Sequence, residues 1–395
     1  GILVCSFLGG MRAVTWTQVA QYIILILAYM IPVIWLSAKH TGNPLPQVAY
    51  GALLDKVSAR EEALLNDPKE IEVRKIFADR ADTAERMLAG FPRSFEEGKA
   101  QAQRALDQAK GRRAPPEQIA AAQKAVDTYP KDANAAKLAW SKDLALRSRT
   151  APPQRHAEAF PAESDAAKSA SRRNFLALVF CLMMGTAALP HILTRYYTTP
   201  SVKEARESVV WSIFFITLLY ITAPALAVLV KFDIYSMLVG SEFSKLPAWV
   251  NSWARVDPTL LSITDVNRDG IVQLAEILIG SDIVVLATPE IAGLPYVISG
   301  LVAAGGLAAA LSTADGLLLT IANALSHDVY YKVLKPDAST IMRLSVSKAL
   351  LLCVAMLAAY VAARKSADIL FLVSAAFSLA AAGFFPALVL GIFWK

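Results

Sequence analysis

The chain has 395 residues, of which 55% are hydrophobic and 18% are charged, and its mean hydropathy is +0.43. This composition is too apolar for a water-soluble enzyme of the same length and indicates a polytopic membrane protein. The formal net charge of +6 is spread thinly, which excludes the clustered basic surface that a nucleic-acid partner requires. We therefore expect an all-α protein that crosses a membrane several times.

Charged residues are concentrated in one segment of the chain. Residues 39–173 hold 24 of the 39 Lys and Arg residues and 19 of the 33 Asp and Glu residues. Outside this segment the chain contains long apolar runs, and about 20 apolar residues are needed for a helix to cross the hydrocarbon core. Such runs predict spans at residues 15–37, 174–193, 208–230, 294–325, 344–363 and 369–394.

The predicted spans divide the chain into five segments. Lys and Arg residues in the short loops favour an inner position for residues 194–207 and 327–343, and strict alternation then places both longer polar segments outside. We expect the end of one span plus one full transmembrane helix in residues 1–38, an external polar helical insert in 39–173, two transmembrane helices in 174–230, an external loop in 231–293, and three transmembrane helices in 294–395.

The insert, residues 39–173, is rich in Ala, Glu, Lys, Gln and Arg, which favour helices. Apolar residues recur at three- and four-residue spacings in 61–90 and 96–110, a pattern typical of amphipathic helices. We expect a helical hairpin or small bundle. The insert could dock a partner, such as a small membrane subunit, or it could be an insertion without a function of its own. The tolerance of loops to insertions favours the second interpretation.

The external loop contains a sharper motif. Residues 265–276 match the twelve-residue calcium loop at every defined position. Gly270 would permit the sharp turn, and the ion would stiffen the loop. The alternative is a polar turn capped by Asp and Asn side chains, with no ion. The predicted calcium donors are Asp265, Asn267, Asp269, the Ile271 carbonyl and Glu276.

Two neighbouring hydroxyls, Ser312 and Thr313, stand inside the apolar run 294–325, three and four residues after Ala309. On a helix these oxygens lie near the Ala309 carbonyl, and oxygen-only ligation suits a hard monovalent cation. Asp315 follows, and an acidic residue inside a span indicates function. The alternative is that both hydroxyls bond the preceding turn of their own helix, and the spacing alone favours this alternative.

A second span, residues 174–193, carries Gly185 and Pro190 five residues apart. This spacing indicates a broken helix, which transporters use to expose backbone groups to a solute. His191 follows the Pro. It could titrate as part of a gate, although a cap at the membrane interface is the simpler interpretation.

Three motifs together resemble the sodium:solute symporter family. They are GGMRAVTWTQ at residues 9–18, the segment 185–195 with its PHILTR core, and LSTADG at residues 311–316. Their order and spacing are similar to the family over about 200 residues. The resemblance is greatest to the bacterial branch of acetate and other monocarboxylate symporters. It implies a partial inverted-repeat fold of the leucine-transporter type.

The resemblance also implies roles for individual residues. Sodium would bind to the Ala309 carbonyl and to the hydroxyls of Ser312 and Thr313. No catalytic residue is implied, and the sequence shows no nucleophile–base pair, His–carboxylate metal cluster or phosphate loop that would indicate an enzyme. The residues implied to face the solute on the broken helix are Leu182, Gly185, Thr186 and Pro190.

The expected function is sodium-coupled symport across the bacterial inner membrane. The entry of sodium down its gradient would drive the uptake of a small organic solute, a monocarboxylate such as acetate, by alternating access. The protein would be in contact with membrane lipid. In the family, helices before those matched here complete both sites, so the chain resembles a symporter truncated at its amino-terminal end. Two alternatives stay open: a transporter-like sensor domain of a signalling protein, and an inactive truncated fragment.

Overall fold

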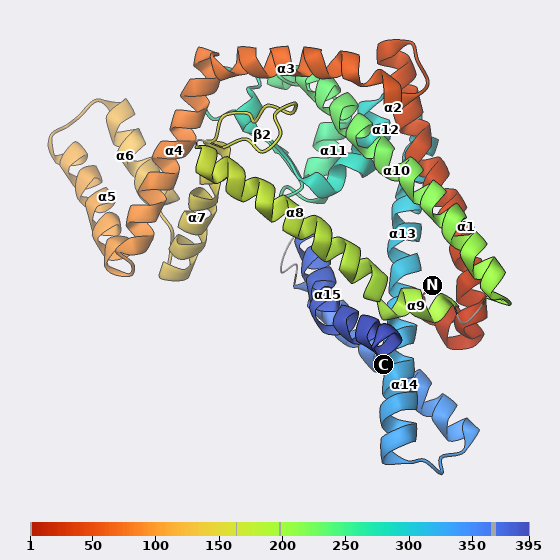
Figure 1. The fold of residues 1–395 in the computed structure, drawn as a ribbon. Coiled ribbons are helices and arrows are strands. Elements are labelled where there is room, and N and C mark those ends of the chain that lie inside the picture. Colours follow the sequence, from red (N-terminus) through yellow and green to blue (C-terminus); the bar gives the residue numbers. More distant parts are fainter. Residues whose placement is uncertain (1, 163, 197–198, 365–368, 395) are drawn as a thin grey trace. The chain divides into compact units, whose positions relative to one another are not determined.

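A computed structural model describes residues 2–162, 164–196, 199–364 and 369–394, with side-chain environments given from residue 14 onward (Figure 1). Helices dominate, and the strands β1 (Leu261–Ile263) and β2 (Ile277–Ile279) form one antiparallel pair with Leu261 opposite Ile279. The α-helices are α1 (Ile2–Thr41), α2 (Pro46–Ala49), α3 (Gly51–Leu65), α4 (Pro68–Ala89), α5 (Arg93–Gly111), α6 (Pro116–Thr128), α7 (Ala133–Ala145), α8 (Asp165–Ala188), α9 (Pro190–Tyr196), α10 (Val202–Met237), α11 (Ala248–Val256), α12 (Val284–Ile291), α13 (Tyr296–Asn323), α14 (Thr340–Ala363) and α15 (Ile369–Phe393). Shorter 3-10 turns are η1 (Leu146–Arg149), η2 (Phe243–Lys245), η3 (Leu274–Glu276) and η4 (Ser281–Ile283), and η5 (Ala324–Leu334) is a π-helix that continues α13.

The chain forms two compact units. The first, called here the membrane unit, comprises Gly1–Val57, His156–Ile234 and Gly280–Lys395. The second, called the polar unit, comprises Ser58–Arg155 and Tyr235–Ile279. The polar unit therefore combines most of the predicted insert with the stretch that contains the calcium-like loop.

Long apolar helices make up the membrane unit. Large apolar side chains such as Trp211, Ile341 and Leu379 are exposed on them, which is the pattern expected of helices that lipid surrounds. The prediction of an all-α polytopic membrane protein is confirmed. Within the described residues, the helices long and apolar enough to cross a membrane are Val14–Ala49, Val202–Met237, Tyr296–Leu334, Thr340–Ala363 and Ile369–Phe393, with a sixth if the bent pair Asp165–Ala188 and Pro190–Tyr196 is one span.

Helix α8 begins before its apolar run. Ser164 accepts a hydrogen bond from the Ala167 N–H and so caps the helix, which starts at Asp165. The polar residues up to 173, at the end of the predicted insert, are therefore the first turns of this helix. The hydropathy pattern ends the insert later because it detects where apolar residues begin and not where the helix begins.

Small residues let pairs of helices in the membrane unit approach closely. α13 packs along α1, and a Cβ added to Gly305 would lie 2.5 Å from the Ala28 Cβ. α8 packs along α15, and a Cβ added to Gly185 would lie 2.5 Å from the Phe377 carbonyl oxygen (Figure 1). Small residues at such contacts are typical of membrane helices, since they bring backbones into van der Waals contact.

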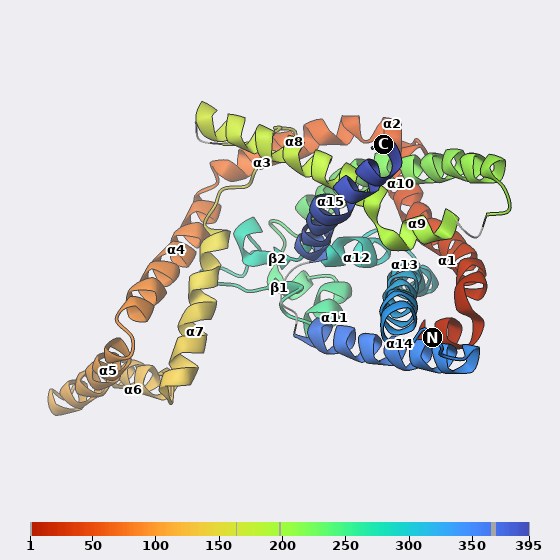
Figure 2. The same ribbon diagram turned by 60° about the horizontal axis from the view of Figure 1, so that its bottom comes forward.

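The polar unit is built around helices whose starting points are fixed by side chains. Asp67 caps α4 through the Lys69 N–H and is followed by a Pro, which is favoured in a first helical turn. The Asp132 carboxylate caps α7 by accepting a hydrogen bond from the Ala135 N–H. α4 and α7 lie side by side, with α5 and α6 beyond them (Figure 2). The core that joins α4, α5 and α7 contains Ala84, Phe95, Ala136 and Trp140.

Candidate functional site

The residues predicted to bind sodium lie together on α13. The Ser312 hydroxyl donates to the Ala309 carbonyl over 2.9 Å, and the Thr313 hydroxyl donates to the same carbonyl over 3.4 Å. These are the hydrogen bonds of hydroxyls that bond the preceding turn of their own helix. Each hydroxyl oxygen still has lone pairs available, so the cluster of three oxygens retains the capacity to ligate a cation.

Helix α1 contributes a contact to this cluster that sequence reasoning missed. The Gln18 side-chain amide donates to the Ser312 backbone carbonyl over 2.7 Å. Gln18 is the last residue of the GGMRAVTWTQ motif, and a polar amide inside an apolar helix was the available signal. Residues 9–13 of the motif lie outside the residues whose side chains are described, and their backbone is part of α1.

The predicted break between Gly185 and Pro190 is present. α8 ends at Ala188, Leu189 is extended, and α9 begins at Pro190 with its axis turned by 44°. Pro190 has no N–H, so the Thr186 carbonyl lacks its usual helical donor. The break therefore leaves a backbone acceptor available inside an apolar span.

The short helix α9 lies against α13 one turn beyond the hydroxyl cluster. A Cβ added to Gly316 would lie 3.2 Å from an Arg195 guanidinium nitrogen and 3.9 Å from the His191 Cβ. His191 Nδ1 is buried without a hydrogen-bond partner. Asp315, on the same turn of α13, is only 1% exposed. The structure thus brings the second half of the broken helix next to the predicted sodium-binding turn.

The residues predicted to bind the solute do not all lie in the same environment. The Thr186 hydroxyl donates to the Leu182 carbonyl over 2.7 Å, and Thr186 is exposed. Gly185 is buried against Phe377 of α15. Of the four predicted residues, Pro190 starts the helix that reaches α13, whereas Gly185 packs against α15.

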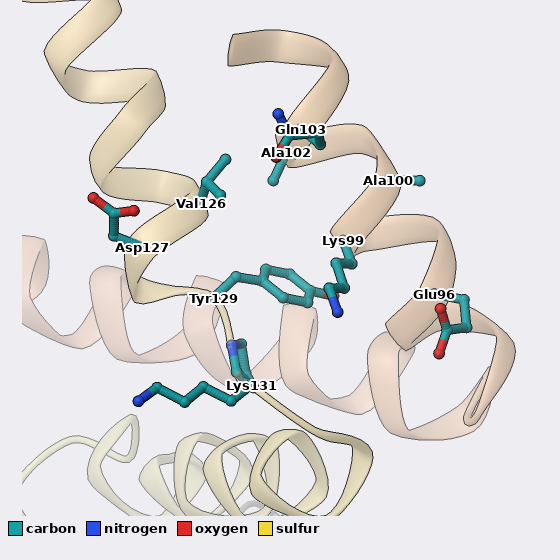
Figure 3. A pocket seen from close by; sticks show the side chains of 10 residues that line it. Glu96, Lys99, Ala100, Ala102, Gln103, Val126, Asp127, Tyr129 and Lys131 are labelled. Carbon is teal, nitrogen blue, oxygen red and sulfur yellow. The ribbon is translucent and has the colours of Figure 1, made fainter. Parts of the chain in front are cut away.

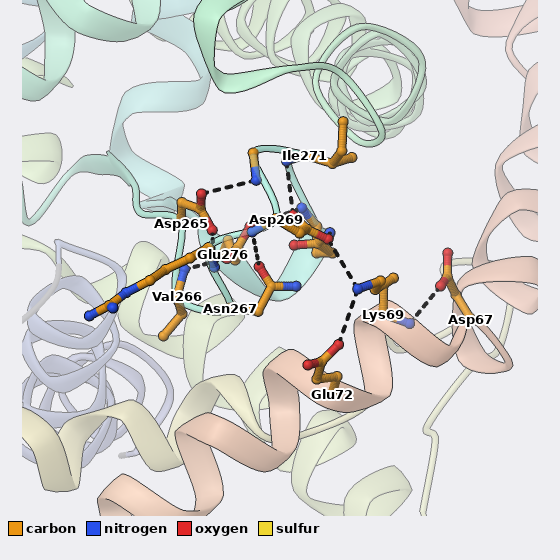
Figure 4. Close-up of polar contacts among 12 residues, drawn as sticks. Asp67, Lys69, Glu72, Asp265, Val266, Asn267, Asp269, Ile271 and Glu276 are labelled. Atoms are coloured by element: carbon orange, nitrogen blue, oxygen red, sulfur yellow. Dashed lines mark hydrogen bonds and ion pairs between the residues drawn. The ribbon is translucent and has the colours of Figure 1, made fainter. Parts of the chain in front are cut away.

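The calcium-like loop has an ordered set of internal hydrogen bonds (Figure 4). The Asp265 carboxylate accepts from the Arg268 and Gly270 N–H groups over 2.6 and 3.1 Å. Glu276 accepts from the Val266 and Gln273 N–H groups over 2.6 and 3.1 Å. Gly270 has a φ of +76°, as the sharp turn in such a loop requires. In the part of the chain that the structure describes, no three His, Cys, Asp or Glu side chains are gathered closely enough to hold a metal ion.

Helix α4 of the insert is attached to this loop. The Glu70 carboxylate, 1% exposed, accepts from the Leu274 and Ala275 N–H groups at the start of η3. Burial raises the pKa of Glu70, against the effect of these hydrogen bonds and of Arg74, which lies 3.6 Å away. Lys69 lies 3.6 Å from the Asp269 carboxylate (Figure 4). Sequence reasoning treated the insert and the loop as separate segments and missed this attachment.

The polar unit also has a surface cavity of about 550 Å³ between α5 and α6. Its wall contains the Tyr129 ring together with charged side chains from both helices (Figure 3). The Tyr129 hydroxyl donates to the Phe95 carbonyl over 3.0 Å, so the ring is held as part of the wall. None of the predicted site residues lines this cavity.

Comparison with known proteins bears on the segment that contains the hydroxyl cluster. The model of the sodium:solute symporter family matches residues 279–395, which include the whole of α13. This part of the chain is therefore similar to the sodium:solute symporter family. The name of the family implies coupling to sodium, and it does not mention calcium.

Two relatives of this chain carry transporter names. An uncharacterized symporter of Cupriavidus necator is 53% identical over 398 residues, which cover 100% of this chain and 58% of the relative. A monocarboxylic acid transporter of Corynebacterium glutamicum is 26% identical over 224 residues, which cover 56% of this chain and 34% of the relative. The chain thus spans less than two thirds of the length of either relative. No solved structure matches it.

Proposed function

We propose that the protein is a sodium-coupled symporter of a small organic solute, with monocarboxylates such as acetate as the substrate class, working by alternating access in a bacterial inner membrane. The observation that carries the proposal is the cluster of Ala309, Ser312 and Thr313 oxygens, which lies inside the segment matched by the family model. The name of the Corynebacterium glutamicum relative supports the substrate class. A partial inverted-repeat fold of the leucine-transporter type belongs to the same proposal.

Sodium would bind at the turn of α13 through oxygens alone. A hard cation prefers carbonyl and hydroxyl oxygens, and the Ala309, Ser312 and Thr313 oxygens are of this kind. Gln18 holds the Ser312 carbonyl from α1, which limits movement of the turn relative to that helix. A bound ion would therefore stabilise one arrangement of α13 and α1 over others.

The solute would bind near the break between α8 and α9. The Thr186 hydroxyl can turn from the Leu182 carbonyl to donate to a carboxylate, and the Thr186 carbonyl lacks its helical donor. Because α9 lies against α13 at Gly316, movement of the broken helix and occupancy of the sodium-binding turn can affect each other. Coupling then requires only that sodium and solute favour the same conformation, and its size is limited by their differential affinity for the two states.

The test is the sodium dependence of labelled acetate uptake by membrane vesicles containing Ser312→Ala or Thr313→Ala protein. Each substitution removes one oxygen ligand, and a hydrogen bond or similar contact to a charged group contributes roughly 1.5–3 kcal/mol. We expect the sodium concentration for half-maximal uptake to rise about tenfold or more.

Ser374→Ala is the matched control. The Ser374 hydroxyl donates to the Leu370 carbonyl over 2.8 Å, a bond within its own helix like those of the hydroxyl cluster. If the α13 hydroxyls only bond their own helix, all three variants should keep the sodium dependence of the unmodified protein. That result would show that sodium does not bind at this turn.

A further inference from the structure

The hairpin formed by η5 and the first turn of α14 exposes apolar and basic side chains next to one another. Val333, Leu334 and Ile341, called here the apolar edge, are 71%, 69% and 80% exposed. Lys332 and Lys335, on the same stretch, are also exposed. At the edge of a bilayer, apolar side chains contact acyl chains while ammonium groups extend to the phosphates. The hairpin therefore has the composition of a segment at that edge.

Hydrogen bonds give the hairpin a defined turn. The Lys335 N–H donates to the Tyr330 carbonyl over 2.7 Å at the end of η5, and the Ala338 N–H donates to the Lys335 carbonyl over 3.1 Å. The Ser339 hydroxyl then accepts from the Met342 N–H and caps α14. Lys335 and the first turn of α14 are therefore held at the same end of the hairpin.

Arg343, in the first turn of α14, is positioned from two sides. Its guanidinium carbon lies 4.1 Å from the centre of the Tyr331 ring on η5, which is a cation–π contact. Its Nη2 donates to the Thr340 hydroxyl over 3.3 Å, and its Nε is buried without a hydrogen-bond partner. In the part of the chain that the structure describes, no carboxylate forms an ion pair with Arg343. A planar group with five N–H donors is thus held in place with its charge uncompensated.

The charges around Arg343 favour an anionic ligand. Residues 324–348 contain four Lys or Arg and two Asp residues, a formal net charge of +2. Asp328 is shared between Lys332 Nζ at 3.3 Å and His327 Nδ1 at 3.1 Å. A phosphate diester would supply the missing negative charge, and a guanidinium can donate two parallel N–H bonds to phosphate oxygens. The residues available to bind it, called here the basic cluster, are Lys332, Lys335 and Arg343.

We propose that this hairpin binds an anionic phospholipid, with the headgroup phosphate on the basic cluster and the acyl chains along the apolar edge. A phospholipid matches both parts of the surface because it carries a phosphate and apolar chains in one molecule. A soluble phosphate would leave the apolar edge exposed. The bound lipid would hold η5 and α14 together at their shared end. The proposal is independent of the sodium and solute sites.

Native mass spectrometry of the purified full chain in detergent tests the proposal. The probe is palmitoyl-oleoyl phosphatidylglycerol, and the reference is the zwitterionic phosphatidylcholine with the same acyl chains. Each Lys or Arg near an anionic headgroup contributes about a factor of five in affinity, so we expect the first phosphatidylglycerol to bind at least about tenfold more tightly than phosphatidylcholine. Arg343→Gln should weaken phosphatidylglycerol binding about fivefold, and Lys332→Gln combined with Lys335→Gln should weaken it about tenfold.

Arg364, at the other end of α14, provides the matched control. Its guanidinium carbon lies 5.1 Å from the centre of the Tyr360 ring, so it repeats the contact between Arg and Tyr, and its Nη2 donates to the Tyr360 hydroxyl. Arg364→Gln should leave the affinity for the first phosphatidylglycerol unchanged. An equal loss in Arg364→Gln and Arg343→Gln would show that the lipid responds to charge in general, which would overturn the assignment to the hairpin.

Two further results would overturn the proposal. One is equal affinity of the unmodified chain for phosphatidylglycerol and phosphatidylcholine. The other is displacement of phosphatidylglycerol by excess inorganic phosphate at constant ionic strength, which would assign the basic cluster to a soluble anion. If Arg343→Gln fails to fold, as judged by its elution and helical circular dichroism, the variant with both Lys residues replaced decides the matter, because both are exposed.

Replacing Tyr331 separates the position of the Arg343 guanidinium from its charge. Tyr331→Leu removes the ring beneath the guanidinium, and the affinity for phosphatidylglycerol should fall about two- to fivefold, the size of an exposed cation–π contact. Tyr331→Phe keeps the ring and should bind as the unmodified chain does. If Tyr331→Leu also binds phosphatidylglycerol as the unmodified chain does, Tyr331 does not position Arg343 for the lipid and the proposed site is wrong.

Discussion

At the scale of single residues, the hydroxyls on α13 stand out in the sequence because the surrounding helix is almost entirely apolar. The amino-acid pattern draws attention to Ser312 and Thr313 and to the Ala309 carbonyl one turn earlier, but their spacing alone favours hydroxyls that bond their own helix. Their predicted role in binding sodium came from the resemblance to the family. Gln18 could not be paired with them, since 294 residues separate it from Ser312. An apolar helix has no single hydrophobic face, so the sequence does not specify which side of α1 meets α13.

Gln18→Met tests whether this contact positions the sodium-binding turn. The substitution keeps the length of the side chain and removes the donor to the Ser312 carbonyl. One such hydrogen bond contributes about 1 kcal/mol, so we expect the sodium concentration for half-maximal uptake to rise about fivefold with little change in the maximal rate. Vesicle uptake at varied sodium concentration measures both quantities.

Thr17→Val is the control for Gln18→Met, because the Thr17 hydroxyl donates to the Val14 carbonyl of its own helix over 2.9 Å. It should leave both quantities unchanged. Equal sodium dependence in Gln18→Met and in the unmodified protein would mean that Gln18 does not position the turn.

At the scale of helices, apolar runs predicted the spans well because their length is fixed by the thickness of the bilayer. The break at Leu189 was also predictable, since Pro190 removes a helical hydrogen bond. The attachment of Glu70 to the Leu274 and Ala275 N–H groups was not, because it joins segments about 200 residues apart and leaves no periodic pattern in either of them. Partner choice between helices depends on such individual contacts.

Gly185→Ala tests the close contact between α8 and α15. The added Cβ would meet the Phe377 backbone carbonyl at 2.5 Å, and a backbone atom cannot rotate away as a flexible side chain can. We expect a loss of about 1–3 kcal/mol in stability, seen as a lower thermal unfolding midpoint in detergent. Gly383→Ala on α15 is the control, because nothing lies within 4 Å of its added Cβ. Equal midpoints for the two variants would contradict the contact.

At the scale of the whole molecule, the chain combines a membrane unit with a polar unit made from the insert and the calcium-like loop, and residues 279–395 match the model of the sodium:solute symporter family. Composition predicted a separate polar segment at residues 39–173, where charged residues are concentrated, and the polar unit contains Ser58–Arg155 of this segment. It did not predict that Tyr235–Ile279 belongs to the same unit as the insert. That association depends on tertiary contacts such as those of Glu70 and Lys69 with the loop.

The most direct test of the proposed function is a paired flux measurement in proteoliposomes that contain the purified protein. An inward sodium gradient should drive accumulation of ¹⁴C-acetate above its equilibrium level, and external acetate should accelerate the entry of ²²Na⁺. Replacing sodium with choline should abolish the accumulation. Acetate entry at the same rate with sodium and with choline, together with ²²Na⁺ entry that acetate does not change, would contradict sodium-coupled symport of this solute.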